Sequence, residues 1–155
     1  MGLTPSDADD ERMMRLALEE ARTALGHGDV PIGAVVSRGD EVLAAAGNQR
    51  ELAADPTAHA EILALRAAAA AVRSWHLEGC TLTVTVEPCA MCAGAAVLSR
   101  LDRLVFGAAD PKAGFAGSLG NLVQDQRLNH QVSLDGGVEG DACGELLRSF
   151  FRVRR

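Results

Sequence analysis

Two short stretches decide the fold and the chemistry of this chain: Thr57-Ala58-His59-Ala60-Glu61 and Glu87-Pro88-Cys89-Ala90-Met91-Cys92. They read H-x-E and, after 26 intervening residues, P-C-x-x-C. Two residues three positions apart lie on one face of a helix, so both cysteine sulfurs would point the same way. Proline suits the first turn of a helix, where its missing N–H has no helical partner. We therefore expect Cys89 and Cys92 at a helix N-terminus, where free N–H groups and the helix dipole favour thiolates.

Two thiolates and one imidazole make a ligand set for a divalent metal ion. Sulfur combined with imidazole selects zinc over magnesium or calcium. Three protein ligands, His59, Cys89 and Cys92, leave the fourth tetrahedral position to water, which is typical of a catalytic zinc rather than a structural one. No ligand spacing is repeated around the other histidines and cysteines, which are His27, His76, His130, Cys80 and Cys143. The two stretches predict one catalytic zinc ion per chain.

Glu61 lies two residues after the predicted ligand His59. Zinc lowers the pKa of a bound water to about 7, and a nearby carboxylate can take that proton and pass it to a leaving nitrogen. The combination predicts hydrolytic loss of ammonia from an amidine carbon. A C-x-x-C pair alone is also typical of a redox pair or of half a structural zinc site, but its occurrence together with H-x-E and the preceding proline favours catalytic zinc.

With these residues in view, the chain resembles the zinc-dependent nucleoside and nucleobase deaminases, and most closely the bacterial tRNA-specific adenosine deaminases. The resemblance runs from about residue 13 to residue 155. It is carried by Asn48 and by the segments 29–35, 55–61, 86–95, 105–108, 116–119, 128–130 and 150–155. The zinc motif is common to the superfamily, whereas the segment 107–130 and the arginine-rich end point to the tRNA branch.

The resemblance implies hydrolytic conversion of the wobble adenosine of a tRNA anticodon to inosine, with Glu61 as the proton shuttle. The base would have to be splayed out, because its reacting carbon is out of reach in a stacked anticodon. The resemblance also implies a homodimer. It assigns substrate contacts to Asn48, Pro31 and the backbone near Ala58, and further RNA contacts to Asp110, Lys112, Phe151, Arg152 and Arg154.

Several of these assignments have plain structural alternatives. Asn48 follows a predicted strand, and its side chain can stabilise a turn by hydrogen bonds to the backbone. Asp110 and Lys112 can belong to a solvated loop. The terminal arginines can simply complement the helix dipole. The runner-up function for the whole chain is a deaminase of a free nucleobase or nucleoside, of the guanine or cytosine type. A different class of protein, a non-catalytic zinc or RNA-binding module, would not need Glu61.

Charge and composition set limits on these functions. A net charge of −6 argues against broad nucleic-acid binding, but the last eight residues supply a local basic patch of four arginines without an acid. Four acids between positions 7 and 11 are the opposite of a basic signal-peptide start, and no apolar run reaches membrane-spanning length. Cysteines that bind a metal, rather than form disulfides, are typical of proteins in a reducing compartment. We expect a cytoplasmic protein without a membrane segment.

Periodicity predicts alternating helices and strands after an opening hairpin. Strands are expected at 31–37, 41–46, 80–86, 103–108 and 130–134, and helices at about 7–27, 58–72, 89–98, 123–129 and 141–152. Ser6 or Asp7 would cap the first helix and Asp141 the last, while Trp75 would fill the core. This order favours an α/β fold with three α/β/α layers and a five-stranded mixed sheet, which the resemblance identifies as cytidine-deaminase-like. Residues 1–155, 48% of them apolar, suit one deaminase domain.

Overall fold

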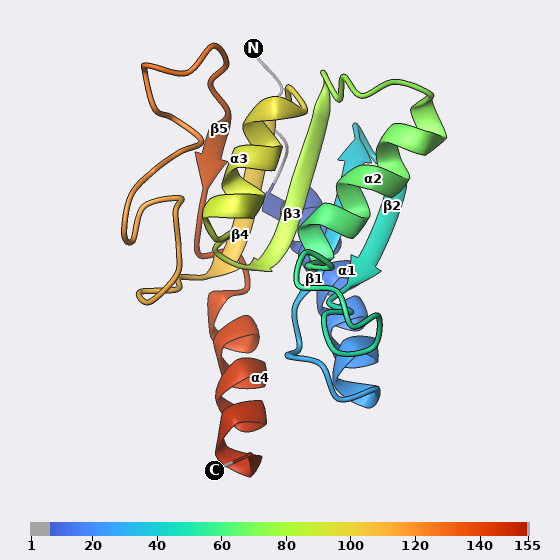
Figure 1. Ribbon diagram of the computed structural model, residues 1–155, viewed down its shortest axis with the longest axis vertical. Coiled ribbons are helices and arrows are strands. Elements are labelled where there is room, and N and C mark those ends of the chain that lie inside the picture. Colours follow the sequence, from blue (N-terminus) through green and yellow to red (C-terminus); the bar gives the residue numbers. More distant parts are fainter. Residues whose placement is uncertain (1–6, 155) are drawn as a thin grey trace.

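The structure, a computed structural model, describes residues 7–154 and is built on one mixed five-stranded sheet (Figure 1). The strands are β1 (Gly33–Arg38), β2 (Glu41–Gly47), β3 (Cys80–Val86), β4 (Arg103–Ala108) and β5 (Ser133–Asp135). They lie in the order β2-β1-β3-β4-β5. β1 is antiparallel to β2 and β3, whereas β3, β4 and β5 are parallel. The predicted five-stranded mixed sheet is confirmed.

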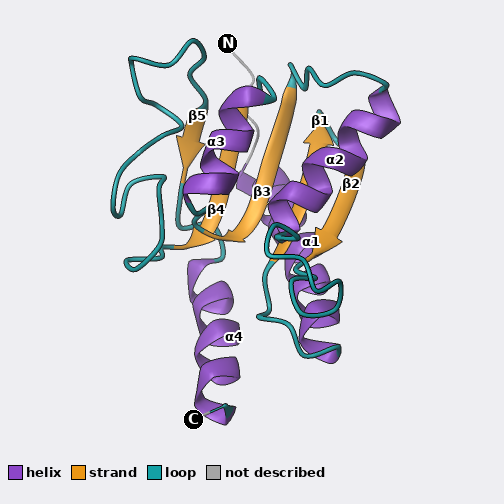
Figure 2. Ribbon diagram, viewed as in Figure 1, coloured by secondary structure: helices purple, strands orange, loops and turns teal. Residues whose placement is uncertain are grey.

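Four helices cover the two faces of this sheet and complete the predicted α/β/α layers (Figure 2). α1 (Asp7–Gly26) and α4 (Gly140–Val153) pack on one face, and α2 (Ala60–Val72) and α3 (Ala90–Leu98) pack on the other. α4 extends beyond the end of the sheet. Within residues 7–154, no helix combines the length and the apolar character needed to cross a membrane.

The alternation of side chains along β3 separates the two halves of the core. Leu82 and Val84 are fully buried on the side of α2 and α3. Thr83 and Thr85 are buried as well, and the Thr85 hydroxyl oxygen accepts a hydrogen bond from the backbone N–H of Gly33 at 3.2 Å. A buried hydroxyl is costly unless it is hydrogen-bonded, so this contact lets a central strand carry threonine.

The hairpin formed by β1 and β2 is packed directly against the backbone of α1. A side chain at Gly33 would overlap the carbonyl of Ala17, and one at Gly47 would collide with the carbonyl of Glu20. Glycine is therefore required at both positions for the helix to approach this closely. The close approach holds the start of β1 and the end of β2, which flank the candidate active site, in a fixed place.

Arg103 at the start of β4 joins α1 to the edge of the sheet. It forms two hydrogen bonds to Asp10, of 2.7 and 2.8 Å, and contacts Asp135 at 2.7 Å. Replacing Arg103 with methionine leaves the carboxylate of Asp10, which is 8% exposed, without this partner. We expect a loss of about 2 kcal/mol in the free energy of unfolding, measured by urea denaturation.

Arg127 provides the matched control for this prediction. It also forms a two-pronged pair, with Asp125 at 3.0 and 2.7 Å, but its side chain is 89% exposed. Exposed ion pairs contribute little to stability, so Arg127→Met should leave the denaturation midpoint unchanged. Equal effects of the two substitutions would contradict the structural role given to Arg103.

Four details differ from the sequence-based predictions. Residues 123–129 form turns rather than a helix, and β5 is shorter and later than the predicted strand at 130–134. Trp75 is 58% exposed and does not fill the core. Asp141 lies in the first turn of α4 rather than at its N-cap, which is Glu139 in a left-handed conformation. Ser6 lies outside the described residues, as does Arg155.

Candidate active site

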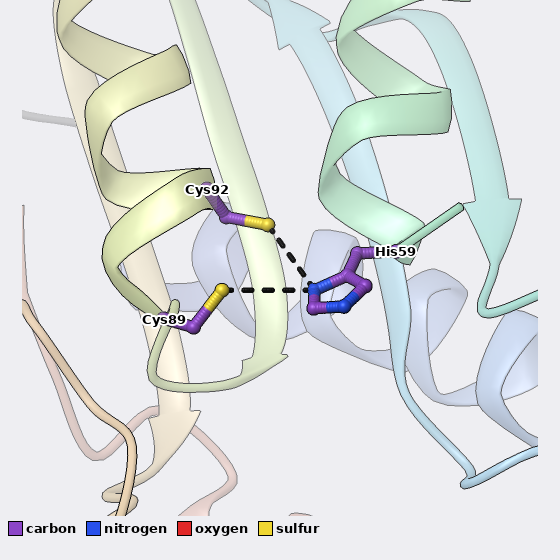
Figure 3. Close-up of side chains that lie close together, drawn as sticks. All are labelled: His59, Cys89 and Cys92. Carbon is purple, nitrogen blue, oxygen red and sulfur yellow. Dashed lines mark hydrogen bonds between the residues drawn. The ribbon is translucent and has the colours of Figure 1, made fainter. Parts of the chain in front are cut away.

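His59, Cys89 and Cys92 converge at the N-terminal ends of α2 and α3 (Figure 3). The Nδ1 atom of His59 lies 3.6 Å from the Sγ atom of Cys89 and 3.5 Å from that of Cys92. Tetrahedral zinc, with bonds of about 2.3 Å to sulfur and 2.05 Å to nitrogen, would separate these atoms by about 3.6 Å. The donor atoms and their spacing therefore fit a zinc ion with three protein ligands.

Two helix N-caps place these three side chains. His59 is the N-cap of α2 and Cys89 the N-cap of α3, both with extended backbone, so the helices begin at Ala60 and Ala90. Cys92 follows one turn into α3 and is fully buried. The prediction of a helix N-terminus at the two cysteines is confirmed, although Pro88 precedes the helix instead of lying in its first turn.

The protonation of the two cysteines is unequal before a metal binds. The Cys92 thiol donates to the Cys89 sulfur and the His59 ring lies beside it, which lowers the pKa of Cys89 to about 3. The same contact, together with burial, raises the pKa of Cys92 above its ordinary value. Zinc requires both sulfurs as thiolates. Metal binding at this cluster would therefore release a proton from Cys92.

Glu61 lies in the first turn of α2, next to this cluster. Its side chain is buried, and burial raises the pKa of its carboxyl group. The carboxyl group also interacts with the thiol of Cys92. A buried carboxyl with a raised pKa holds a proton more readily than an exposed carboxyl does, which is a property that a proton shuttle needs.

A small cavity of about 160 Å³ opens beside His59 and Glu61. Its wall also includes Asn48, whose contact with substrate stays a prediction, and is completed by Val30, Ile32, Arg50 and Ala60. The Asn48 side chain also stabilises the surrounding backbone, because its Nδ2 donates to the Val30 carbonyl at 3.2 Å and its Oδ1 accepts from the Arg50 N–H at 3.0 Å. These two bonds aim the amide group, and one Nδ2 hydrogen remains for a ligand.

Pro31 and Ala58 are buried near this cavity but are not among the residues that line it. Both backbone polar groups of Ala58 already have partners: its N–H donates to the Asp55 carbonyl at 3.1 Å, and its carbonyl accepts from the Gln49 N–H at 3.0 Å. The structure thus gives Ala58 a role in closing the loop that leads to His59. Its contact with substrate stays a prediction.

The other five predicted substrate residues meet in one open groove of about 710 Å³. Asp110 and Lys112 contribute one wall from the loop after β4. The other wall is formed by α4 and by Arg154, which directly follows it; the α4 residues are Leu147, Arg148, Phe151 and Arg152. Glu145 contacts Arg148 at 3.3 Å and Arg152 at 2.8 Å, while Arg154 stacks over the Phe150 ring at 4.2 Å. The groove therefore combines cations and an exposed aromatic ring.

Comparison with known proteins agrees with this geometry. The MafB19-like deaminase family matches residues 8–155. The chain is 50% identical to a tRNA-specific adenosine deaminase of Bacillus subtilis (strain 168), over 94% of this chain and 91% of that protein. It is 45% identical to one of Haemophilus influenzae, over 94% of this chain and 85% of that protein. This chain belongs to the bacterial tRNA-specific adenosine deaminases.

The fold of this deaminase has a solved counterpart in the same family. A structure from a study of A-to-I editing by tRNA:A34 deaminases superimposes with a TM-score of 0.85 at 40% sequence identity, covering 88% of this chain and 99% of that chain. The match supports both the α/β/α architecture and the assignment to the deaminase superfamily made from the zinc motif.

Two buried carboxylates at the site of this deaminase were missed by the sequence analysis. Asp29 is fully buried and accepts hydrogen bonds from the N–H groups of Glu51 at 2.6 Å and Leu52 at 3.1 Å. The Nδ1 atom of His27 lies 3.0 Å from the same carboxylate. Asp29 thereby holds the loop between Asn48 and His59. The only signal in the sequence was an acid directly before an apolar strand, which does not reveal its partners.

Glu87 is the second missed carboxylate, although it stands inside the quoted zinc motif. Burial raises the pKa of this group, but hydrogen bonds from the Ser118 hydroxyl and from three backbone N–H groups outweigh it, so the pKa of Glu87 lies below its ordinary value. The group is thus an anion at neutral pH. The only feature of the sequence that could have indicated a role for Glu87 was an acidic residue at the end of a predicted buried strand.

Proposed function

We propose that this protein converts the wobble adenosine of a tRNA anticodon to inosine by hydrolysis, with one zinc ion per chain held by His59, Cys89 and Cys92. The observation that carries the proposal is the zinc-sized triangle of His59 Nδ1 and two cysteine sulfurs with the buried carboxyl of Glu61 beside it. Relatives at 45–50% identity are named tRNA-specific adenosine deaminases. The proposal takes residues 1–155 as one deaminase domain acting in the cytoplasm.

Each residue of the site has a defined task in this reaction. Bound zinc supplies the Lewis acidity that makes water a nucleophile at neutral pH. With zinc bound, Glu61 would take one proton of the attacking water and deliver it to the ring nitrogen of adenine. It would then take the second proton from the hydroxyl added to the base and deliver it to the amine, so that ammonia leaves as the carbonyl of inosine forms. Asn48 holds the edge of the base through its remaining Nδ2 hydrogen, in a cavity whose size suits a single flipped base.

The groove beside α4 receives the RNA backbone in this proposal. Lys112, Arg152 and Arg154 provide the cations that phosphates need on a chain whose net charge is −6, and Phe151 offers a ring on which a base can stack. Glu145 forms ion pairs with Arg148 and Arg152 in the free protein. Exposed ion pairs of this kind are weak, so a phosphate can replace the carboxylate.

We also propose that the protein is a homodimer joined through α2 and α3. An apolar depression of about 360 Å³ lies across these helices and the segment that follows α2; it is lined by Ile62, Leu65, Arg66, Ala69, Trp75, Leu77, Ala95, Leu98 and Ser99. Trp75 is 58% exposed and Leu98 is 73% exposed at this surface. A second copy of the chain, presenting the same apolar residues, is the occupant that this face fits.

Replacing Leu98 with aspartate is expected to convert the dimer to a monomer, because a charge would be buried at the centre of an apolar interface. Light scattering coupled to size-exclusion chromatography measures the mass directly. The control is Val153→Asp, which introduces the same charge at a position that is 85% exposed on α4. A wild-type monomer, or an L98D variant that remains dimeric, would contradict the proposed interface.

The catalytic proposal is tested with two sets of substrates. The zinc-loaded protein is incubated with an anticodon stem-loop carrying a wobble adenosine, and separately with free adenine, adenosine, guanine and cytosine; products are identified by mass spectrometry of nucleosides. Inosine should form only in the RNA. Ammonia released from a free base, with an inert stem-loop, would instead establish the free-base deaminase. No turnover of any substrate would favour a non-catalytic zinc protein.

A further inference from the structure

Glu87 is a buried carboxylate bound by a single loop. Within residues 7–154, its side-chain hydrogen bonds all come from loop 109–121, which connects the end of β4 to the turns before β5. Oε1 accepts the N–H of Asp110 at 3.0 Å and the hydroxyl of Ser118; Oε2 accepts the N–H groups of Ala116 at 3.0 Å and Ser118 at 2.9 Å. The side chain is 3% exposed, so water does not compete for these bonds.

The loop is wrapped tightly around this carboxylate. A Cβ atom at Gly114 would overlap the carboxyl atoms of Glu87, so no side chain can be accommodated there without moving them. The N–H of Phe115 also donates to the carbonyl of Pro88 at 2.9 Å, one residue before Cys89. Loop 109–121 is thus attached at two points to the segment that begins α3.

The attachment extends to the residues that line the RNA groove. The N–H of Asp110 is held by Glu87, and the carboxylate of Asp110 in turn accepts the N–H groups of Lys112 at 3.1 Å and Ala113 at 3.2 Å. Asp110 and Lys112 form the loop side of the groove. Through these bonds, the position of the groove wall is tied to the position of Cys89.

We infer that Glu87 is a positioning residue, which holds the groove wall formed by Asp110 and Lys112 at a set place relative to the metal cluster. The inference rests on the proposed function, because the groove is taken to receive RNA. With the wall fixed, RNA bound in the groove would present its base to the small cavity without reordering the loop. Preorganisation of this kind lowers the cost of binding.

The four bonds explain why a carboxylate is needed at this position. A glutamine has nearly the same size but only one acceptor oxygen, and its NH₂ group would face N–H donors of the loop. Glu87→Gln should therefore release either the N–H of Asp110 or the N–H groups of Ala116 and Ser118, depending on which way the amide is turned, because the Ser118 hydroxyl can also accept from the NH₂ group. Hydrogen–deuterium exchange should show faster exchange of the amide of residue 110, or of the amides of residues 116 and 118, in the variant than in the wild type.

The kinetic test separates positioning from general stability. For Glu87→Gln with wild-type zinc content, we expect KM for the stem-loop to rise about tenfold and kcat to change by less than about threefold. An unchanged KM would overturn the inference. Loss of zinc and of kcat with an unaltered KM would also overturn it, because Glu87 would then only stabilise the start of α3, where the metal ligands lie. A wild-type protein inactive on RNA would refute the proposed function, while the amide exchange would still report whether Glu87 holds the loop.

Two further variants leave Glu87 in place and decide the matter if E87Q does not fold. Ser118→Ala removes only the hydroxyl bond, and Gly114→Ala pushes against the carboxylate without changing charge. Both should raise KM in the same direction, S118A by about twofold to threefold because one contact of four is lost. Unchanged KM values in both variants would overturn the inference.

Discussion

Replacing Glu61 with glutamine is expected to lower kcat on the anticodon stem-loop by about 10³-fold, while zinc stays at one ion per chain. The two side chains have almost the same size, so the buried position at the start of α2 stays filled. Glutamine cannot accept a proton from water or return it to the leaving amine. The change therefore removes the proton shuttle and leaves His59, Cys89 and Cys92 intact.

Single-turnover kinetics with metal analysis of the same samples measures this effect. Glu78→Gln supplies the matched control, because the Glu78 side chain is 70% exposed and contacts His76 rather than the metal cluster. The control should retain wild-type kcat. If E61Q retained both zinc and wild-type turnover, Glu61 would not be the proton carrier, and the non-catalytic interpretation of the zinc site would gain support.

Replacing Cys92 with alanine is expected to abolish both zinc binding and deamination. Cys92 is fully buried, and its sulfur is one of three donors that lie within 4.8 Å of one another. Two remaining donors leave zinc with a histidine and one thiolate, which is too few for a stable site at the metal concentrations of a cell. Zinc content per chain, measured by mass spectrometry of the metal, should fall from one to a small fraction.

Cys80→Ala tests whether this loss is specific to the cluster. Cys80 is as deeply buried as Cys92, but it lies at the start of β3 and does not belong to the metal cluster. The C80A variant should keep its full zinc content and its activity, with at most a modest loss of stability. Zinc retained by C92A would show that another residue completes the site and would contradict the proposed ligand set.

The sequence was most informative where periodicity and burial coincide. β3 and β4 have the predicted bounds, because both are central strands that are buried over most of their length and are followed by residues outside regular secondary structure. The metal cluster followed from the spacing of Cys89 and Cys92 on one helix and from the H-x-E pattern. The strand bounds depend on neighbouring residues, and the metal cluster is recognised from a sequence motif. Both can therefore be predicted without knowledge of long-range contacts.

Long-range packing accounts for what the sequence did not predict. Trp75 lies on the α2–α3 surface, and its apolar character alone could not distinguish a core residue from a surface one. The segment 123–129 lacks a helix because it is held by local turns and by a bond from Val132 N–H to the Val123 carbonyl at 2.9 Å. The groups that donate hydrogen bonds to the carboxylates of Asp29 and Glu87 lie 22 to 31 residues away in the chain, and the composition of the sequence does not reveal them.

The way in which Glu87 holds its loop bears on how substrate range can change during evolution. Three of its four bonds are made to main-chain N–H groups, which every amino acid except proline provides. The side chains of Ala109, Lys112 and Ala113 can therefore be exchanged without loss of the anchor that shapes the loop. Under the proposed function, single substitutions on the surface of this loop should change which RNA is bound, while the metal cluster and Glu61 stay unaltered.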